Sequence, residues 1–354
     1  HVPSVRVDID REVDLIEEFA RIYGLDKIPL PAPKAALVPG ADDRPTQAVM
    51  VCRQHLVGLG LRETMNYSYV SDHLLNLFDP SDVQHRVVLP NPVNLEQATL
   101  RPSLVPQMVE SLGRNLARHV EEAGLFEIGR VFWLDESGQP AEEGLLSIGL
   151  MGPVGRSGLD RRKAVSAEEM FLWIKGLWEN LAAALGIPDH DHEQVSVHCL
   201  EPGHAVNLLV DGKPVGVMGL LNKDLRREWR MTGPVAVLEV QLAPILAHVF
   251  KEKSFAPMAA FPSVSRDAAF VVEQGVKHED ILKIVKKVAP KELEKVELFD
   301  IFTGEGIGAG KKSVAYSFTY RSLTRTLTDE DANRYHELVK DALKKELGVE
   351  VREG

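Results

Sequence analysis

The stretch GEGIGAGKK, residues 304–312, contains the residue types that bind phosphate: four glycines at alternate positions, followed by two lysines. Glycine loops of nucleotide-binding proteins are preceded by a strand and followed by a helix, whose N-terminus supplies amide donors to the phosphate. Here the residues that follow, KKSVAYSFTYRS, alternate between apolar and polar types and predict a strand. We therefore expect a hairpin connection rather than a dinucleotide-binding or P-loop site.

A second candidate site is a set of carboxylates near the start of the chain. Asp14, Glu17 and Glu18 have the i, i+3, i+4 spacing that places side chains on one helix face. Asp8 precedes them on a predicted strand and can fold back towards that face. Four converging carboxylates would repel one another unless a hard cation such as Mg²⁺ neutralised them. The alternative, which the spacing alone favours, is a solvated acidic first turn stabilised by the helix dipole.

The composition indicates a globular protein of two or three domains, because 354 residues exceed what one hydrophobic core usually serves. Cys52 and Cys199 lack the number and spacing of a disulfide framework or a zinc site. No apolar run or signal pattern predicts membrane insertion or export, so we expect a cytoplasmic protein without a membrane partner. The formal net charge of −11 argues against indiscriminate nucleic-acid binding, although residues 262–354 are nearly neutral.

The predicted elements fall into three parts. Residues 1–40 contain one amphipathic helix and a proline-rich stretch without periodicity, which indicates a linker. Residues 41–253 mix helices with antiparallel strands, which favours an α+β fold over a parallel sheet. Within them the polar stretch 189–192 is expected to be a loop rather than a metal site. Residues 254–354 have the order βαββαβ of the ferredoxin-like unit.

Several segments resemble one family in the same order along the chain. FPSVSRDAAFVV and RTLTDEDANRYHELVKDALKKELG resemble the ferredoxin-fold anticodon-binding domain that ends the bacterial phenylalanyl-tRNA synthetase β subunit. RVDIDREVDLIEEFARIYGLDKIP is similar to the end of that subunit's winged-helix-like domain. NPVNLEQATLRPSLVPQMVESLGRNLAR, GLFEIGRVF, FLWIKGLWENLAAALG and DGKPVGVMGLLNKD resemble its class II synthetase-like core. The chain is therefore similar to a C-terminal fragment of that subunit.

The resemblance implies a domain assignment. Residues 1–40 would be the C-terminal part of a winged-helix-like metal-binding domain with its linker. Residues 41–253 would be a noncatalytic class II synthetase-like core with an antiparallel sheet, and residues 254–354 the ferredoxin-fold anticodon-binding domain. It also implies that Mg²⁺ is a cofactor, because Asp8, Asp14, Glu17 and Glu18 match the family's magnesium ligands position by position. This match reverses the preference for a solvated acidic turn.

The resemblance further implies a phenylalanine-tRNA ligase that assembles as a heterotetramer of two α and two β subunits. The α subunit would carry aminoacylation, and tRNA-Phe would be bound partly by the β subunit. ATP would be used by the holoenzyme but not bound by this part of the β subunit, so we expect the fragment alone to be inactive.

The core lacks the sequence signatures with which class II synthetases bind ATP. One signature is an arginine followed two residues later by glutamate on a strand, but Arg101 is followed by Pro102 and Ser103. The other is a glycine-alternating strand that ends in arginine before a helix, and the alternating glycines lie in the last domain before a strand. Without charges positioned on a triphosphate, we expect a structural core.

The third strand of the last domain predicts which sheet face could contact RNA. Its apolar residues, Val314, Tyr316, Phe318 and Tyr320, are expected to fill the core rather than to stack on bases. The open face would then carry Ser317, Thr319 and Arg321 as candidate tRNA contacts. Arg266 at the entrance of the first strand and Arg325 at a later turn are further candidates, with surface ion pairs as the alternative.

Two other functions remain open at this level: a stand-alone RNA-binding module, and an enzyme that activates an amino acid by itself. Binding to an α subunit would separate the first from a ligase subunit. ATP–pyrophosphate exchange by the isolated chain would identify the second.

Overall fold

The structure is a computed structural model that describes residues 1–31, 43–92, 94–156, 158–188, 190–251, 255, 258–304, 307–308 and 310–352. The chain divides into two compact units, residues 1–252 and 253–354. The predicted boundaries at 40/41 and at 253/254 lie outside the described residues, so their positions stay predictions.

The N-terminal segment contains helix α1 (Glu12–Tyr23) and the short 3₁₀ helix η1 (Leu25–Lys27). The apolar stripe predicted for α1 is present, but Val13, Ile16 and Phe19 are exposed. The strand expected before α1 is wrong: residues 1–11 form turns and extended coil. No strand in the described residues pairs with them, and a strand needs a partner for its backbone hydrogen bonds.

A seven-stranded sheet forms the centre of the first unit, in the order β1-β4-β5-β9-β8-β7-β6. Among its described strands, β1 and β4 pair in parallel and the other neighbours pair antiparallel. This arrangement confirms the predicted α+β core. The strands are β1 (Arg62–Glu63), β4 (Ala123–Leu134), β5 (Pro140–Met151), β6 (His190–Gln194), β7 (Leu200–Val210), β8 (Lys213–Leu221) and β9 (Val235–Gln241).

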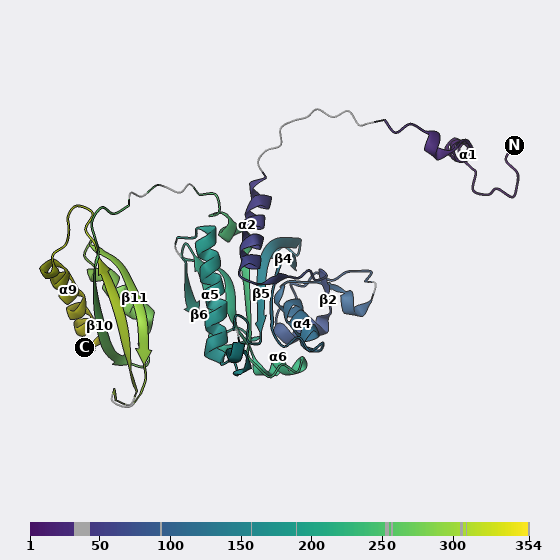
Figure 1. The fold of residues 1–354 in the computed structure, drawn as a ribbon. Helices are drawn as coiled ribbons and strands as arrows, with labels where there is room; N and C mark the ends of the chain where they lie inside the picture. The colour runs from purple at the N-terminus through teal and green to yellow at the C-terminus, as the bar shows by residue number, and fades with distance from the viewer. Residues whose placement is uncertain are drawn as a thin grey trace. The chain divides into compact units, whose positions relative to one another are not determined.

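Helices cover both faces of this sheet (Figure 1). On one face α2 (Arg44–Gly58) and α5 (Ala167–Leu185) bury an apolar cluster that includes Leu56, Ile148 and Trp178. On the other face the cluster around Met108 and Leu112 lies beneath three helices. These are α3 (Asp72–Phe78), α4 (Val105–Leu116) and α6 (Lys223–Glu228). The remaining short elements are β2 (Tyr69–Val70), β3 (Thr99–Leu100), α7 (Leu242–Leu246), η2 (Leu95–Gln97) and η3 (Gly158–Arg162).

Of the polar stretch 189–192 that we expected to be a loop, residues 190–192 belong to the edge strand β6, and residue 189 lies outside the described residues. His190 pairs with Val210 and Gln194 with Val206, so β6 extends the sheet beyond β7. An edge strand tolerates polar residues on both sides because one of its edges and much of its surface face solvent. Polarity alone therefore could not distinguish this strand from a loop.

The second unit is a four-stranded antiparallel sheet in the order β11-β12-β10-β13, with two helices on one face. Its chain order is β10 (Val264–Glu273), α8 (His278–Val288), β11 (Leu293–Phe302), β12 (Lys311–Tyr320), α9 (Asp329–Leu347) and β13 (Glu350–Arg352). The first and third strands lie at the centre, which confirms the predicted ferredoxin-like fold.

The predicted burial of the β12 aromatics is confirmed. Tyr316, Phe318 and Tyr320 have no exposed surface, and they pack with Phe270 of β10 beneath α8 and α9. Burial of each such side chain contributes about 1.5–3 kcal/mol to folding. These aromatic side chains are therefore core residues and do not lie on the opposite face of the sheet.

The glycine stretch connects two paired strands, as predicted. Phe302 at the end of β11 lies opposite Ser313 near the start of β12. Gly308 and Gly310 have φ values of +95° and +80°, which favour glycine in the turn. Residues 305, 306 and 309 of this stretch lie outside the described residues.

Candidate functional site

The face of the second unit's sheet that α8 and α9 do not cover, called the open face below, is the first candidate site. The strand register places on it residues that alternate with the buried set. Its central residues are Ser265 and Asp267 of β10, Lys295, Glu297, Asp300 and Phe302 of β11, and Ala315, Ser317 and Thr319 of β12.

Two of the predicted tRNA contacts lie side by side on the open face. Ser317 lies between Asp267 and Glu297 on the neighbouring strands. Thr319 lies between Ser265 and Lys295, and its hydroxyl is 3.5 Å from the Ser265 hydroxyl. The Ser317 and Thr319 hydroxyls therefore form a polar strip along β12, and the carboxylates of Asp267 and Glu297 lie on either side of Ser317.

Arg321 follows β12 directly and is half-buried. Its Nε donates to Oε2 of Glu294 at 2.9 Å, and its Nη1 donates to the carbonyl of Phe261 at 3.0 Å. These bonds hold the guanidinium at the end of the strip that Ser317 and Thr319 form. The structure thus groups three of the five predicted tRNA contacts.

Arg266 and Arg325 lie elsewhere. Arg266 pairs with the buried Phe318 in register, so it lies on the helix-covered side, where it donates to Asp329 at 2.5 Å. Arg325 donates to Oδ2 of Asp331 at 2.6 Å, and this contact holds the pKa of Asp331 at about 2. Both arginines therefore pair with acidic residues at the start of α9, which is the alternative that the sequence left open.

The prediction from sequence missed Phe302, an aromatic residue on the open face. Its side chain is 49% exposed, and the nearby Phe299 and Ile301 are also exposed. The register of β11, an edge strand, shifts between Leu298 and Asp300, and such a bulge bends a strand and breaks its alternation locally. The apolar run LFDIF was a usable signal, because a run without alternation does not fit a strand with one buried face.

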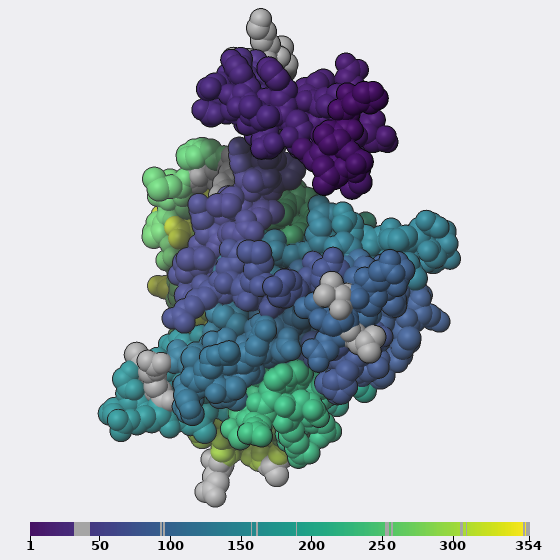
Figure 2. Space-filling model, turned by 90° about the vertical axis from the view of Figure 1, so that its right-hand side faces the viewer, coloured from purple at the N-terminus to yellow at the C-terminus, as the bar shows by residue number. Residues whose placement is uncertain are grey.

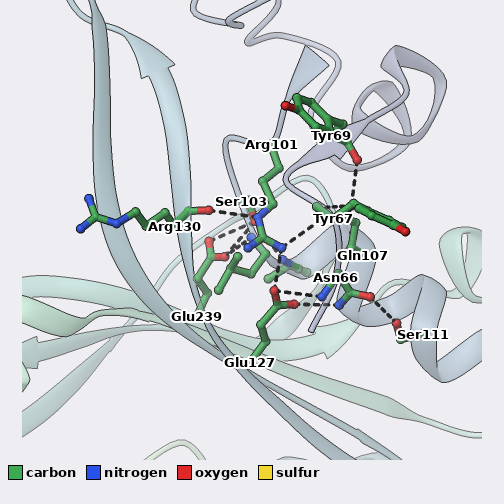
Figure 3. A network of polar contacts seen from close by, with 12 residues as sticks. Asn66, Tyr67, Tyr69, Arg101, Ser103, Gln107, Ser111, Glu127, Arg130 and Glu239 are labelled. Carbon is green, nitrogen blue, oxygen red and sulfur yellow. Dashed lines mark hydrogen bonds and ion pairs between the residues drawn. The ribbon is translucent and has the colours of Figure 1, made fainter. Parts of the chain in front are cut away.

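A second candidate site is a buried polar network in the core of the first unit (Figure 3). The Arg101 guanidinium donates to Oε1 of Glu127 at 2.7 Å and to Gln107 at 3.2 Å. Oε2 of Glu127 accepts from the Asn66 amide at 2.7 Å, and Oδ1 of Asn66 accepts from the Ser111 hydroxyl at 2.9 Å. The network joins β4 and α4 to the segment 64–70.

The network holds this segment by its backbone. Gln107 Nε2 donates to the carbonyls of Tyr67 and Tyr69 at 2.7 and 3.1 Å (Figure 3). The outward side chains of the segment are Met65, Tyr67 and Tyr69, which are 93%, 75% and 42% exposed. These three residues, called the exposed ridge below, are large apolar or aromatic groups on a fixed backbone.

Glu239 is a third part of the core site. Its carboxylate accepts from the Leu104 backbone N–H at 2.6 Å and from the Ser103 hydroxyl at 3.0 Å. Burial raises the pKa of Glu239. The carboxylate therefore fixes the N-terminus of α4 on the sheet rather than facing solvent.

Comparison with known proteins identifies the family. The profile described as "Phenylalanyl tRNA synthetase beta chain CLM domain" matches residues 28–242. The chain belongs to the phenylalanyl-tRNA synthetase beta chain family. Two further profiles match, "Ferredoxin-fold anticodon binding domain" over residues 259–352 and "tRNA synthetase B5 domain" over residues 1–25. The family and the order of its segments predicted from sequence are confirmed.

Curated members of the beta chain family match almost the whole chain. The phenylalanine–tRNA ligase beta subunit of Symbiobacterium thermophilum is 34% identical over 99% of this chain and 39% of its own length. That of Listeria monocytogenes is 33% identical, and 43% of its own length is covered. The chain thus spans about two fifths of the length of these relatives. Among solved structures, a pyrrolysyl-tRNA synthetase of Desulfitobacterium hafniense is 18% identical over 57% of this chain and 65% of its own, with a TM-score of 0.45.

The beta chain family led us to expect magnesium at Asp8, Asp14, Glu17 and Glu18. In the structure Arg6 donates to Asp8 at 2.6 Å and to Glu18 at 2.7 Å, and these contacts lower the pKa of both carboxylates to about 2. Asp14 instead accepts from the Arg11 backbone N–H at 2.7 Å. The described residues contain no group of three or more possible ligands that could hold a metal ion. As arranged, Asp8 and Glu18 neutralise the Arg6 guanidinium, and the four carboxylates are not gathered around one metal position.

The core of this beta chain also differs from an ATP site in its polar groups. Strand β9 leads directly into helix α7, so this junction has the strand-then-helix order that the second ATP-binding signature requires. Here β9 reads VAVLEVQ, so Gln241 stands at the junction and no glycine precedes it. Arg101 is buried in its ion pair with Glu127. Neither position presents a cation to a triphosphate.

Proposed function

We propose that this chain contributes tRNA binding and subunit assembly to a cytoplasmic phenylalanine–tRNA ligase, in which an α subunit carries out aminoacylation. The observation that carries the proposal is the polar open face on a domain whose profile is described as anticodon-binding. The curated relatives are named as beta subunits of this ligase, which supports the assignment. None of the described helices is long and apolar enough to cross a membrane.

The open face suits nucleobases better than phosphates. Asp267, Glu297 and Asp300 outnumber Lys295, which itself pairs with Glu297 at 2.6 Å. Carboxylates accept hydrogen bonds from base N–H groups and repel phosphates, while serine and threonine hydroxyls can donate or accept. An exposed phenylalanine such as Phe302 offers a surface for base stacking. We infer that unpaired bases lie on this face and that phosphates lie at its rim.

The test is binding of tRNA-Phe and of a tRNA with a different anticodon loop. We expect the chain to bind tRNA-Phe more tightly, because the open face would contact bases rather than the shared backbone. Equal affinity for the two tRNAs, with a salt dependence typical of phosphate contacts alone, would contradict base recognition here.

We further propose that the exposed ridge binds the partner α subunit in an α₂β₂ assembly. Tyrosine, methionine and other large side chains on a fixed backbone are typical of the centre of protein interfaces. Helix α2 lies at the surface of the unit (Figure 2), and Met50 and Val57 on it are exposed as well. Purification of a stable complex with the α subunit would test this proposal. Separate elution of the two chains would argue for a stand-alone RNA-binding module.

Magnesium binding at Asp8, Asp14, Glu17 and Glu18 also stays a proposal, supported by the B5 match over residues 1–25. It requires Arg6 to leave Asp8 and Glu18, because a guanidinium and a divalent ion cannot share the same carboxylate oxygens. When bound, Mg²⁺ would neutralise the carboxylates and hold the start of α1. Arg6 would then be free to pair elsewhere.

A further inference from the structure

A pocket of about 460 Å³ lies on the sheet of the first unit, beyond the part that helix α4 covers. Val235 and Val237 of β9 pack in the apolar cluster beneath α4. Alternation along the strand therefore places Glu239 and Gln241 on the same face, and both line the pocket. Pro102, just before α4, closes one side of it.

The lining is mainly apolar, with a few polar groups at fixed positions. Val131, Leu145 and Val217 form the floor, and Trp133 contributes a half-buried indole. Such a lining is typical of sites that bind small organic molecules. The pocket is thus chemically different from the open face of the second unit, which is mainly polar.

The polar groups are carboxylate and amide groups. Gln241 Nε2 donates to Oε2 of Glu143 at 3.2 Å, which positions that carboxylate at the pocket. Asn207 contributes a second amide. Glu239 is already bonded to Ser103 and to the Leu104 N–H, so Glu143 is the carboxylate with capacity left for a ligand.

The charged residues of the lining indicate the sign of the charge that a ligand would carry. All residues that line this pocket are described, and none of them is a lysine or an arginine. A neighbouring pocket of about 330 Å³ shares Pro102 and Trp133 and is lined by Asp82, Asp135 and Glu136, with His85 as its one basic residue. An anion would meet the Glu143 carboxylate with only neutral amides beside it, whereas a cation could pair with Glu143 and lie against the Trp133 ring.

We propose that this pocket binds a small organic cation, an ammonium group carried on an apolar or aromatic body. The body occupies the floor formed by Val131, Leu145 and Val217, and the ammonium donates to Glu143. The strand-to-helix step at Gln241 belongs to the same pocket. With no lysine or arginine in its lining the pocket offers no cation to a triphosphate, whereas its acceptor groups match an amine. This inference does not depend on tRNA binding or on subunit assembly.

The test is calorimetric titration of the 354-residue chain with phenethylamine, and with 3-phenylpropionate as a similar body of opposite charge. We expect phenethylamine to bind and 3-phenylpropionate not to bind. Glu143→Gln removes the charge and should weaken phenethylamine binding about tenfold, the equivalent of about 1.4 kcal/mol. Trp133→Leu should weaken it as well, with the unfolding midpoint measured to show that the variant is folded.

The matched control is Glu142→Gln. Glu142 is the adjacent residue of β5, but it pairs with Arg130 and is not part of the pocket. Its substitution should leave phenethylamine affinity unchanged. The proposal is overturned if phenethylamine does not bind at concentrations up to about 10 mM, ten times a dissociation constant of about 1 mM. Equal binding of 3-phenylpropionate, or a Glu143→Gln variant that binds like the parent, overturns it too.

Discussion

The guanidinium of Arg101 lies 2.7 Å from the carboxylate of Glu127, and the two side chains are only 4% and 2% exposed. Removing two charges from water is unfavourable, so a buried ion pair is a weak source of stability by itself. Here the pair bonds through Gln107 and Asn66 to the segment that carries the exposed ridge. We infer that the pair sets the geometry of that segment.

Breaking this ion pair should destabilise the core strongly. Arg101→Met leaves the Glu127 carboxylate buried without its partner, which is expected to lower the free energy of unfolding by about 3–5 kcal/mol. Urea denaturation of the parent and the variant measures the difference. The double variant Arg101→Met with Glu127→Leu should recover much of the loss, because neither charge then remains buried. If it recovers none of the loss, the ion pair is not the cause.

Substitution in the exposed ridge should affect assembly without affecting stability. Tyr67→Ser changes a side chain that is 75% exposed, so the free energy of unfolding should move by no more than about 0.5 kcal/mol. If Tyr67 contacts the partner centrally, affinity for the α subunit should fall by about 2 kcal/mol or more. Val83→Ser, at a position 57% exposed outside the ridge, is the control. An unchanged complex with Tyr67→Ser would place the interface elsewhere.

We expect substitutions of Phe302 and of Arg321 at the open face to affect tRNA binding in different ways. Phe302→Ala should weaken tRNA binding by about 1–3 kcal/mol, the value of one base–aromatic stack, with little change in the salt dependence. Arg321→Ala should weaken binding and flatten its salt dependence, if the guanidinium contacts a phosphate. Binding measured over a series of salt concentrations separates the two.

Arg266 provides the matched control for Arg321, because it is also an arginine of this unit but pairs with Asp329 on the helix-covered side. Arg266→Ala should change tRNA affinity less than Arg321→Ala does. A larger effect of Arg266 would move the interface to the start of α9.

The second unit should lose stability at acidic pH through His336. This side chain is buried, its Nδ1 lies 3.3 Å from the Tyr320 hydroxyl, and burial lowers its pKa. The folded state therefore binds the proton less readily than the unfolded state, whose histidine titrates near 6.5. Stability is present above about pH 6.5 and is lost as the pH falls below it. Thermal unfolding measured between pH 7.5 and 5 should show this loss of stability. His336→Gln should make stability depend less steeply on pH, and an unchanged pH dependence would assign the loss to other groups.

Magnesium should compete with Arg6 at the N-terminal segment. If the proposed site forms, titration with Mg²⁺ should give heat that disappears in Asp14→Asn. Arg6→Gln removes the competing guanidinium and should strengthen binding. Absence of heat in all three proteins, or identical heats with and without Asp14, would rule out the site in this chain.

Much of the second unit could be predicted from local sequence pattern. The alternation in KKSVAYSFTYRS places Tyr316, Phe318 and Tyr320 on one face, and they are buried as that alternation requires. The same alternation placed Ser317 and Thr319 on the opposite face. The strand after the glycines was sufficient to predict a hairpin there. These features depend on neighbouring residues along one chain segment, which the sequence reports directly.

The partners of charged side chains could not be predicted in this way. From the sequence, Arg266 and Arg321 were equally good candidates for tRNA contacts. In the structure α9 brings Asp329 to Arg266 from 63 residues further along the chain. Asp8 and Glu18 have the spacing of metal ligands, and the fold places the Arg6 guanidinium between them. A long side chain pairs with whatever charge lies within reach, and that depends on how distant segments meet.

The sequence alone therefore determined the family, the order of elements and the division of the β12 side chains between core and open face, because periodicity records burial. Only the tertiary structure decided which of the predicted residues share a surface: Ser317, Thr319 and Arg321 do, whereas Arg266 and Arg325 pair with α9. It also formed the pocket at Trp133, whose lining comes from five strands of one sheet. Such a site has no local signature, since its residues become neighbours only when the strands pair.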